Sequence, residues 1–229
     1  MQITKIAFAS MLACSALPQL AAAKSADEGY YVTGRVIDAV HKAANMDASA
    51  RPGIGQFVPG EERKEFATGA VGVGYTFSNG WRTEGEYTFR RNNTFTSGSS
   101  TFATSFNVND IESQRLMLNV YRDFAIADGW SVYGNGGIGL VHVKSGGWQG
   151  NESRRYIDTT RTQLAWALGA GVSYAPIDRL TMDLGYRYVS MGTAESGWNA
   201  FPNARGLQDE KLSLDLTSRE IYLGARYAF

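Results

Sequence analysis

An alternation of apolar and polar residues with a period of two runs through almost the whole chain, and it constrains the fold more than any other feature. From Ala67 to Phe77 the odd positions are mostly large and apolar, whereas the even positions are Thr, Ala and Gly. The tight-turn sequence Ser78-Asn79-Gly80 follows, and a second alternating run begins at Trp81. Side chains of a β-strand point to opposite faces in turn, so the pattern predicts paired antiparallel strands.

The same pattern recurs to the end of the chain and predicts eight strands, the first starting near Tyr30 and the last ending at Phe229. The connections between them alternate strictly in length. Those at 78–80, 125–129 and 175–179 are short, and those at 41–65, 92–110, 144–160 and 190–217 are long and polar. Such regularity is typical of an up-and-down meander. We therefore expect an all-β chain that forms an eight-stranded antiparallel barrel.

The first residues predict the compartment. Lys5 precedes an apolar run over 6–17, and Ala21 to Ala23 follow it. This is the arrangement of a secretory signal peptide, which we expect over 1–23, with the barrel domain over 24–229. A buried N-terminal helix is the alternative. The one cysteine, Cys14, lies in the predicted signal, so neither disulfides nor thiolate sites are expected in the exported protein.

The two faces of the predicted strands differ in chemistry, and the difference indicates a transmembrane barrel. One face is aliphatic and aromatic, whereas the other carries six Arg and five carboxylates: Arg35, Arg82, Glu84, Glu86, Arg90, Arg115, Asp123, Asp183, Arg187, Glu220 and Arg226. A sheet in hydrocarbon must close on itself with its apolar face outward. The charges would then pair in a lumen only wide enough for side chains. A water-soluble barrel turned the other way is the alternative.

Composition and motif spacing exclude several classes of function. The 22 Lys and Arg balance the 22 Asp and Glu, so no nucleic-acid surface is expected. His41 and His142 lie in different predicted segments, and we predict no metal site and no cofactor. Ser145 and Glu152 leave a Ser–His–acid hydrolase open, but no spacing brings them together with His142. We therefore expect no catalytic residue and no enzymatic activity.

The C-terminal residues carry a resemblance to a known family. The ending Tyr222-Leu223-Gly224-Ala225-Arg226-Tyr227-Ala228-Phe229 is similar to the assembly signal of outer-membrane barrels, with Tyr222, Gly224, Tyr227 and Phe229 at the characteristic positions. The stretches 118–124, 132–139 and 184–188 resemble opacity-type outer-membrane proteins, although Arg122 stands where that family commonly has Tyr. The resemblance implies an eight-stranded barrel of the bacterial outer membrane that is inserted by the barrel-assembly machinery.

The long polar connections are the expected functional surface. They contain aromatic and basic residues suited to contacts with other surfaces, namely Trp148, Arg154, Arg155, Trp198 and Phe201. The two arginines could meet lipopolysaccharide phosphates or a sulfated glycan. We expect a monomeric surface protein that stabilises the envelope and displays loops for adhesion or host contact. A small-solute porin or hydrophobic-compound channel is the alternative, and a lipid A-modifying hydrolase is a more distant one.

Overall fold

The computed structural model describes residues 28–46, 57–102 and 106–229. Within these ranges the chain forms nine strands: β1 (Gly29–Ala44), β2 (Phe57–Pro59), β3 (Arg63–Thr76), β4 (Trp81–Ser99), β5 (Asn107–Ala127), β6 (Trp130–Gln149), β7 (Asn151–Ile177), β8 (Leu180–Glu195) and β9 (Ser213–Ala228). No helix among the described residues is long and apolar enough to cross a membrane. The predicted signal segment, 1–23, lies outside the described residues.

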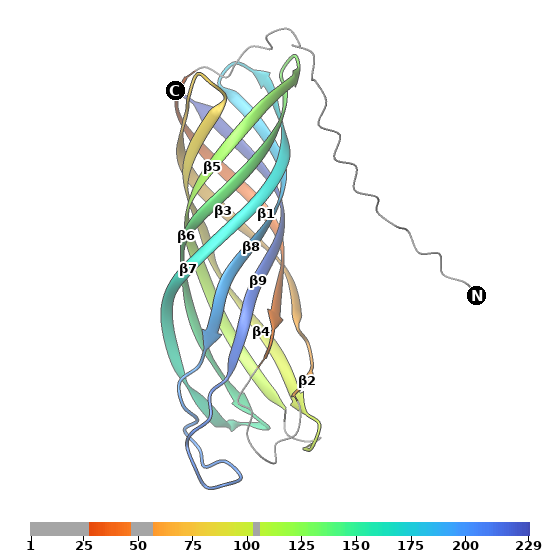
Figure 1. Cartoon of the computed structure of the whole chain (residues 1–229), viewed down its shortest axis with the longest axis vertical. Coiled ribbons are helices and arrows are strands. Elements are labelled where there is room, and N and C mark those ends of the chain that lie inside the picture. The colour runs from red at the N-terminus through yellow and green to blue at the C-terminus, as the bar shows by residue number, and fades with distance from the viewer. Residues whose placement is uncertain (1–27, 47–56, 103–105) are drawn as a thin grey trace, which may run out of the picture.

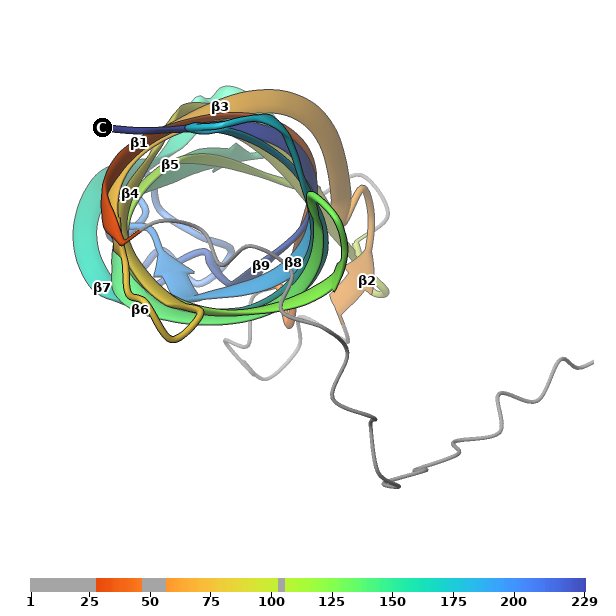
Figure 2. The ribbon, with the colours of Figure 1, turned by 90° about the horizontal axis from the view of Figure 1, so that it is seen from above.

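Eight of the strands close into a ring of tilted antiparallel neighbours (Figures 1 and 2). The ring runs β4-β3-β1-β9-β8-β7-β6-β5, and β5 pairs back onto β4. Each ring strand pairs with the ring strand that follows it in the chain, and β1 joins β9 over fourteen residue pairs to close the ring. The predicted eight-stranded up-and-down barrel is confirmed. The short strand β2 was not predicted; it lies outside the ring and pairs with β4.

The three short turns gather at one end of the barrel, which we call the turn end. Gly80 and Gly129 take positive φ angles of 78° and 70° there, a conformation that glycine adopts without strain. Phe229 donates its amide to the Tyr30 carbonyl at 3.1 Å, so the first and last strands also meet at this end. In Figure 1 the turn end is at the top, beside the C-terminus.

The strands extend much further from the turn end than the alternation predicted. Most of 92–110 and 144–160, which we expected as loops, is strand, and only Gly150 separates β6 from β7. The long connection between β8 and β9 is likewise shorter than 190–217. These segments keep a period of two, but with the polarity of the two faces exchanged. The sequence pattern therefore predicted loops here, because the outward positions of these segments are polar rather than apolar.

The exchange of faces divides the barrel into two zones. In the zone next to the turn end the outward side chains are apolar: Ile221 and Leu223 of β9 are each 55% exposed, whereas the neighbouring Glu220 faces the lumen and is 1% exposed. Further along the same strand, Leu214 and Leu216 are buried inside and Asp215 faces outward. We call this second zone, with its apolar interior and polar exterior, the extension.

A β-bulge in β4 marks the boundary between the zones. Its pairing with β5 shifts between Thr88 and Arg91, so the inward positions change from even to odd numbers. The placement of Arg90 in the lumen is therefore wrong. Its side chain is 57% exposed and pairs with Glu112 at 3.1 Å on the outside. Beyond this level β3 and β4 no longer pair, since their ladder covers only Ala70–Thr76 and Arg82–Thr88.

Close backbone approach at Gly139 should be required for the ring. A Cβ there would lie 2.1 Å from the Leu116 carbonyl oxygen on β5, whereas a Cβ at Gly134 on the same strand has no heavy atom within 4 Å. We predict that Gly139→Val prevents barrel closure and that Gly134→Val does not. Unboiled wild-type protein and Gly134→Val should migrate faster on a denaturing gel than boiled samples. Identical migration of unboiled and boiled wild-type protein would contradict the barrel.

Candidate functional site

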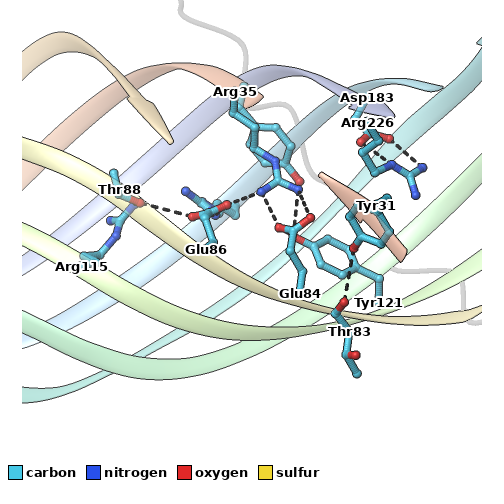
Figure 3. Close-up of polar contacts among 12 residues, drawn as sticks. Tyr31, Arg35, Thr83, Glu84, Glu86, Thr88, Arg115, Tyr121, Asp183 and Arg226 are labelled. Carbon is cyan, nitrogen blue, oxygen red and sulfur yellow. Dashed lines mark hydrogen bonds and ion pairs between the residues drawn. The ribbon is translucent and has the colours of Figure 1, made fainter. Parts of the chain in front are cut away.

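Six charged side chains from five strands form one continuous ion-pair chain across the lumen, which we call the central cluster. Its order is Glu84, Arg35, Glu86, Arg187, Glu220 and Arg115. The Glu84–Arg35 pair is 2.5 Å long, the two pairs of Arg187 are 2.8 and 2.6 Å, and Arg35 also contacts Glu86. Figure 3 shows Arg35 between the two carboxylates of β4. All six side chains are at most 4% exposed.

The central cluster holds three cations and three anions, which is why it can be buried. An unpaired ion in a low-dielectric interior costs several kcal/mol, so each carboxylate must meet a guanidinium and each guanidinium a carboxylate. Arg35 donates two bonds to Glu84, of 2.5 and 3.0 Å. Such a fork needs the planar guanidinium, and this explains why arginine rather than lysine occupies these lumen positions.

Two further ion pairs lie closer to the turn end. Arg82 contacts Asp123 at 2.8 Å, and Arg226 contacts Asp183 at 2.8 Å. Buried tyrosines separate them from the central cluster: the guanidinium of Arg82 lies 3.7 Å from the Tyr121 ring. The structure thus places ten of the eleven predicted lumen residues inside the barrel, and Arg90 is the exception described above.

An apolar cluster fills the lumen on the other side of the central cluster, and the sequence reasoning missed it. Its members come from seven strands and their flanking residues: Ala43, Met46, Phe95, Ile111, Met117, Val141, Val143, Ala165, Ala167, Val189, Met191, Ala194, Leu214 and Leu216. The cavity beside His41 and Arg115, between the two clusters, has a volume of about 10 Å³, which holds at most one water molecule. At the turn end a vestibule of about 340 Å³ ends against Asp123 and Arg226.

The predicted contact residues lie at the far end of the extension. Trp198 is 50% exposed, with the Lys211 ammonium 4.4 Å from its ring centroid, and the Arg155 side chain is 59% exposed. Trp148 is half-buried in β6 and packs edge-on against Phe106.

Phe201 was expected as a contact residue, and this expectation is wrong. It is 7% exposed and packs in a small apolar cluster with Tyr156 and Leu212. The guanidinium of Arg154 lies 4.2 Å from the centre of its ring. Phe201 therefore stabilises the end of the extension, and Arg154 covers it.

Polar pairs cover the outside of the extension. Arg161 contacts Glu195 at 2.6 Å, and Lys144 contacts Asp158 at 2.9 Å. The hydrogen bond and the negative charge of Asp158 raise the pKa of Lys144 above its usual value. Because these side chains are about half exposed, each pair adds little to stability, and their main effect is to keep the outer surface hydrated.

The candidate hydrolase residues do not come together. His142 faces outward and bonds to Thr162 at 3.0 Å, whereas Ser145 faces inward and is 2% exposed. The spacing of three in a strand puts them on opposite sides of the wall. His41 lies inside and bonds to Asn93 at 3.1 Å. In the part of the chain that the structure describes, no group of three His, Cys, Asp or Glu could hold a metal ion.

The residues of the predicted assembly signal lie on both faces of β9. Tyr227 and Phe229 face outward, 47% and 72% exposed, with ring centroids 6.0 Å apart. Tyr222 faces the lumen, where its hydroxyl lies 2.9 Å from that of Tyr133. Gly224 faces the same way, against Arg35.

Known proteins share both the sequence pattern and the fold. The family model described as "Outer membrane protein beta-barrel domain" matches residues 6–229. The chain belongs to this family. Outer membrane protein PagN of Salmonella typhimurium is 27% identical over 230 residues, which cover 91% of this chain and 93% of PagN. Two solved structures share the fold: Neisserial surface protein A (TM-score 0.52, 17% identity) and OprG of Pseudomonas aeruginosa (TM-score 0.54, 11% identity), each match covering 88% of this chain and 97% of the other.

Membership of this family identifies the protein as a bacterial outer-membrane barrel, and the apolar outward zone is the part that faces lipid. Barrels of this class have short turns on the periplasmic side and longer elements outside. This rule predicts a periplasmic turn end and an extracellular extension. Large outward aromatics mark the two edges of the band, among them Trp81, Trp130 and Phe229 near the turns and Phe89 and Trp166 at the bulge level.

Removal of one charge from the central cluster should be strongly destabilising. Glu86→Gln leaves Arg35 and Arg187 in a buried site with one carboxylate fewer, and we expect a loss of about 3–5 kcal/mol in the free energy of unfolding. Glu112→Gln is the matched control, because it breaks the exposed pair with Arg90 and should change stability by less than about 1 kcal/mol. Urea titration of tryptophan fluorescence in lipid vesicles measures both. An equal free energy of unfolding for the two variants would contradict a stabilising role of the central cluster.

Proposed function

We propose that the protein is a non-enzymatic surface protein that holds a rigid contact surface outside the outer membrane. The observation that carries the proposal is the extension, whose strands continue beyond the lipid-facing band around an apolar core. A core of this kind fixes the positions of the residues at its end. Long disordered loops would instead lose conformational entropy each time they bound a partner.

Exposed apolar side chains at the end of the extension support the proposal. Trp198 and Ile157 are 50% and 55% exposed, and the amide of Ile157 donates to the Trp198 carbonyl, so the two residues are neighbours. Phe102 and Phe106 are 45% and 41% exposed. Large exposed aromatics rimmed by charges are common in surfaces that bind other macromolecules. We infer that this end serves adhesion or host contact.

A role in stabilising the envelope is the second part of the proposal. Arg63, Arg90 and Arg219 face outward near the bulge level, where the lipid-facing band ends. Guanidinium groups at that height can pair with phosphates of lipopolysaccharide. We further propose that the barrel-assembly machinery reads Tyr222, Gly224, Tyr227 and Phe229, and that the barrel works as a monomer, since its ring closes within one chain.

The pore alternative finds little support in the lumen. The central cluster and the apolar cluster occupy successive levels of a barrel whose interior has room for side chains only. We predict that refolded protein in planar bilayers gives no steady unitary currents. Steady currents that disappear on boiling the sample would overturn the display function in favour of a porin.

Contact by the exposed end can be tested on cells. We predict that a non-adherent laboratory bacterium expressing the protein gains binding to cultured epithelial cells, and that Trp198→Ser with Ile157→Ser lowers the number of bound bacteria about tenfold. Gln208→Ala, an exposed residue of the same segment, is the control and should bind like wild type. Equal surface levels are checked by antibody. Binding that survives the double substitution would contradict a contact surface at this end.

A further inference from the structure

Arg122 is a charged residue on the lipid-facing side of the barrel. In the lipid-facing part of β5 the outward positions are Leu116, Leu118, Val120, Arg122 and Phe124, and Arg122 is the ionic one among these five. It lies opposite Trp81 of β4 and Gly134 of β6. Trp81 belongs to the aromatic residues at the periplasmic edge of the band, so Arg122 is at the level of the lipid headgroups.

The protein itself provides only some of the hydrogen-bond and charge partners that the Arg122 guanidinium can take. One terminal nitrogen donates to the Asn79 carbonyl in the β3–β4 turn, and the guanidinium carbon is 5.4 Å from the ring centroids of both Trp81 and Phe124. Among the ion pairs of the described residues, none joins Arg122 to a carboxylate. Its neighbour Asp123 points into the barrel and pairs with Arg82 at 2.8 Å. The site therefore keeps a positive charge that faces the membrane.

Small residues of the lipid-facing surface lie directly beside this charge. Gly134 has no heavy atom within 4 Å of the position a Cβ would take, and its partner on β7 is Ala170. On the row above, Gly136 faces the same way, with Leu168 3.5 Å from its Cβ position. Gly134 and Ala170, on two adjacent strands, thus leave this part of the surface without large side chains, whereas the lipid-facing surface around them carries large apolar ones.

We propose that Arg122, Trp81 and Gly134 form a binding site for an anionic glycerophospholipid of the periplasmic leaflet. The lipid phosphate pairs with the guanidinium, which offers donors in the geometry that a phosphate oxygen pair accepts. One acyl chain lies over the small residues Gly134 and Ala170. The lipid is anionic rather than zwitterionic because nothing at the site neutralises the arginine, so a net negative headgroup gains the full attraction.

The test uses Trp81 as a reporter of the lipid beside it. The full chain, with its other four tryptophans replaced by Phe, is refolded into phosphatidylcholine bilayers that contain increasing fractions of brominated phosphatidylglycerol. Bromine quenches indole fluorescence on contact. We expect Trp81 to prefer phosphatidylglycerol over phosphatidylcholine about fivefold, the effect of roughly one basic residue at a membrane surface.

Two substitutions separate the parts of the site. Arg122→Gln should reduce the preference to about one, and Gly134→Leu should weaken it while keeping the charge. Arg179→Gln, which removes a periplasmic arginine from the β7–β8 turn, is the matched control and should leave the preference unchanged. Heat-modifiable gel mobility verifies that each variant is folded.

A wild-type preference near one would overturn the proposal, as would a preference that survives Arg122→Gln. Equal quenching by brominated phosphatidylethanolamine and phosphatidylglycerol would overturn the assignment of an anionic lipid.

Discussion

Closure of the sheet, in which the first strand β1 pairs with the last strand β9, is the interaction on which the rest of the structure depends. Hydrocarbon offers no partner to a backbone amide or carbonyl, so a spanning sheet cannot have a free edge. With eight strands the closed ring leaves room only for side chains. Every side chain that faces inward must therefore fit into the lumen and find its hydrogen-bond or ion-pair partners there. The central cluster meets this requirement with three arginines and three glutamates, and the glycines on the inner faces leave space for them.

The same ring of strands lies partly in lipid and partly in water, and the polarity of its inner and outer faces differs between the two parts. Beside lipid the outer face is apolar and the interior ionic, whereas outside the membrane the interior is apolar and the outer face ionic. The bulge between Thr88 and Arg91 makes this change possible in β4 without breaking its pairing to β5. In β9 the change needs no bulge, because Leu214 and Leu216 stay on the same face as Glu220 and only their chemistry differs. The extension thus has the apolar interior and polar exterior of a water-soluble β-fold.

The functional sites of this architecture are on its outer surfaces rather than in the lumen. The lumen holds charges, but they neutralise one another and are covered on the outer side by the apolar cluster. The imidazoles at positions 41 and 142 point to opposite sides of the wall. What the molecule offers to partners is its extracellular end and its lipid-facing band. Kinship with an outer-membrane family agrees with both, although it identifies no ligand.

Much of the fold could be predicted from the alternation, because a period of two and the turn residues are local properties. They predicted eight strands, the three tight turns and which side of β4 carries Arg82, Glu84 and Glu86. The same reasoning failed at Arg90. The β-bulge there shifts the register of β4 by one residue, and no local sequence pattern predicts that shift. It also failed in the extension: Leu212, Leu214 and Leu216 alternate clearly in the sequence, but only their burial shows which side is the interior. By itself the sequence determined a closed, outward-apolar barrel, since hydrocarbon permits no other sheet. Which charges meet, where the faces exchange and that Phe201 is buried were decided by tertiary structure, because each depends on residues brought together from distant strands.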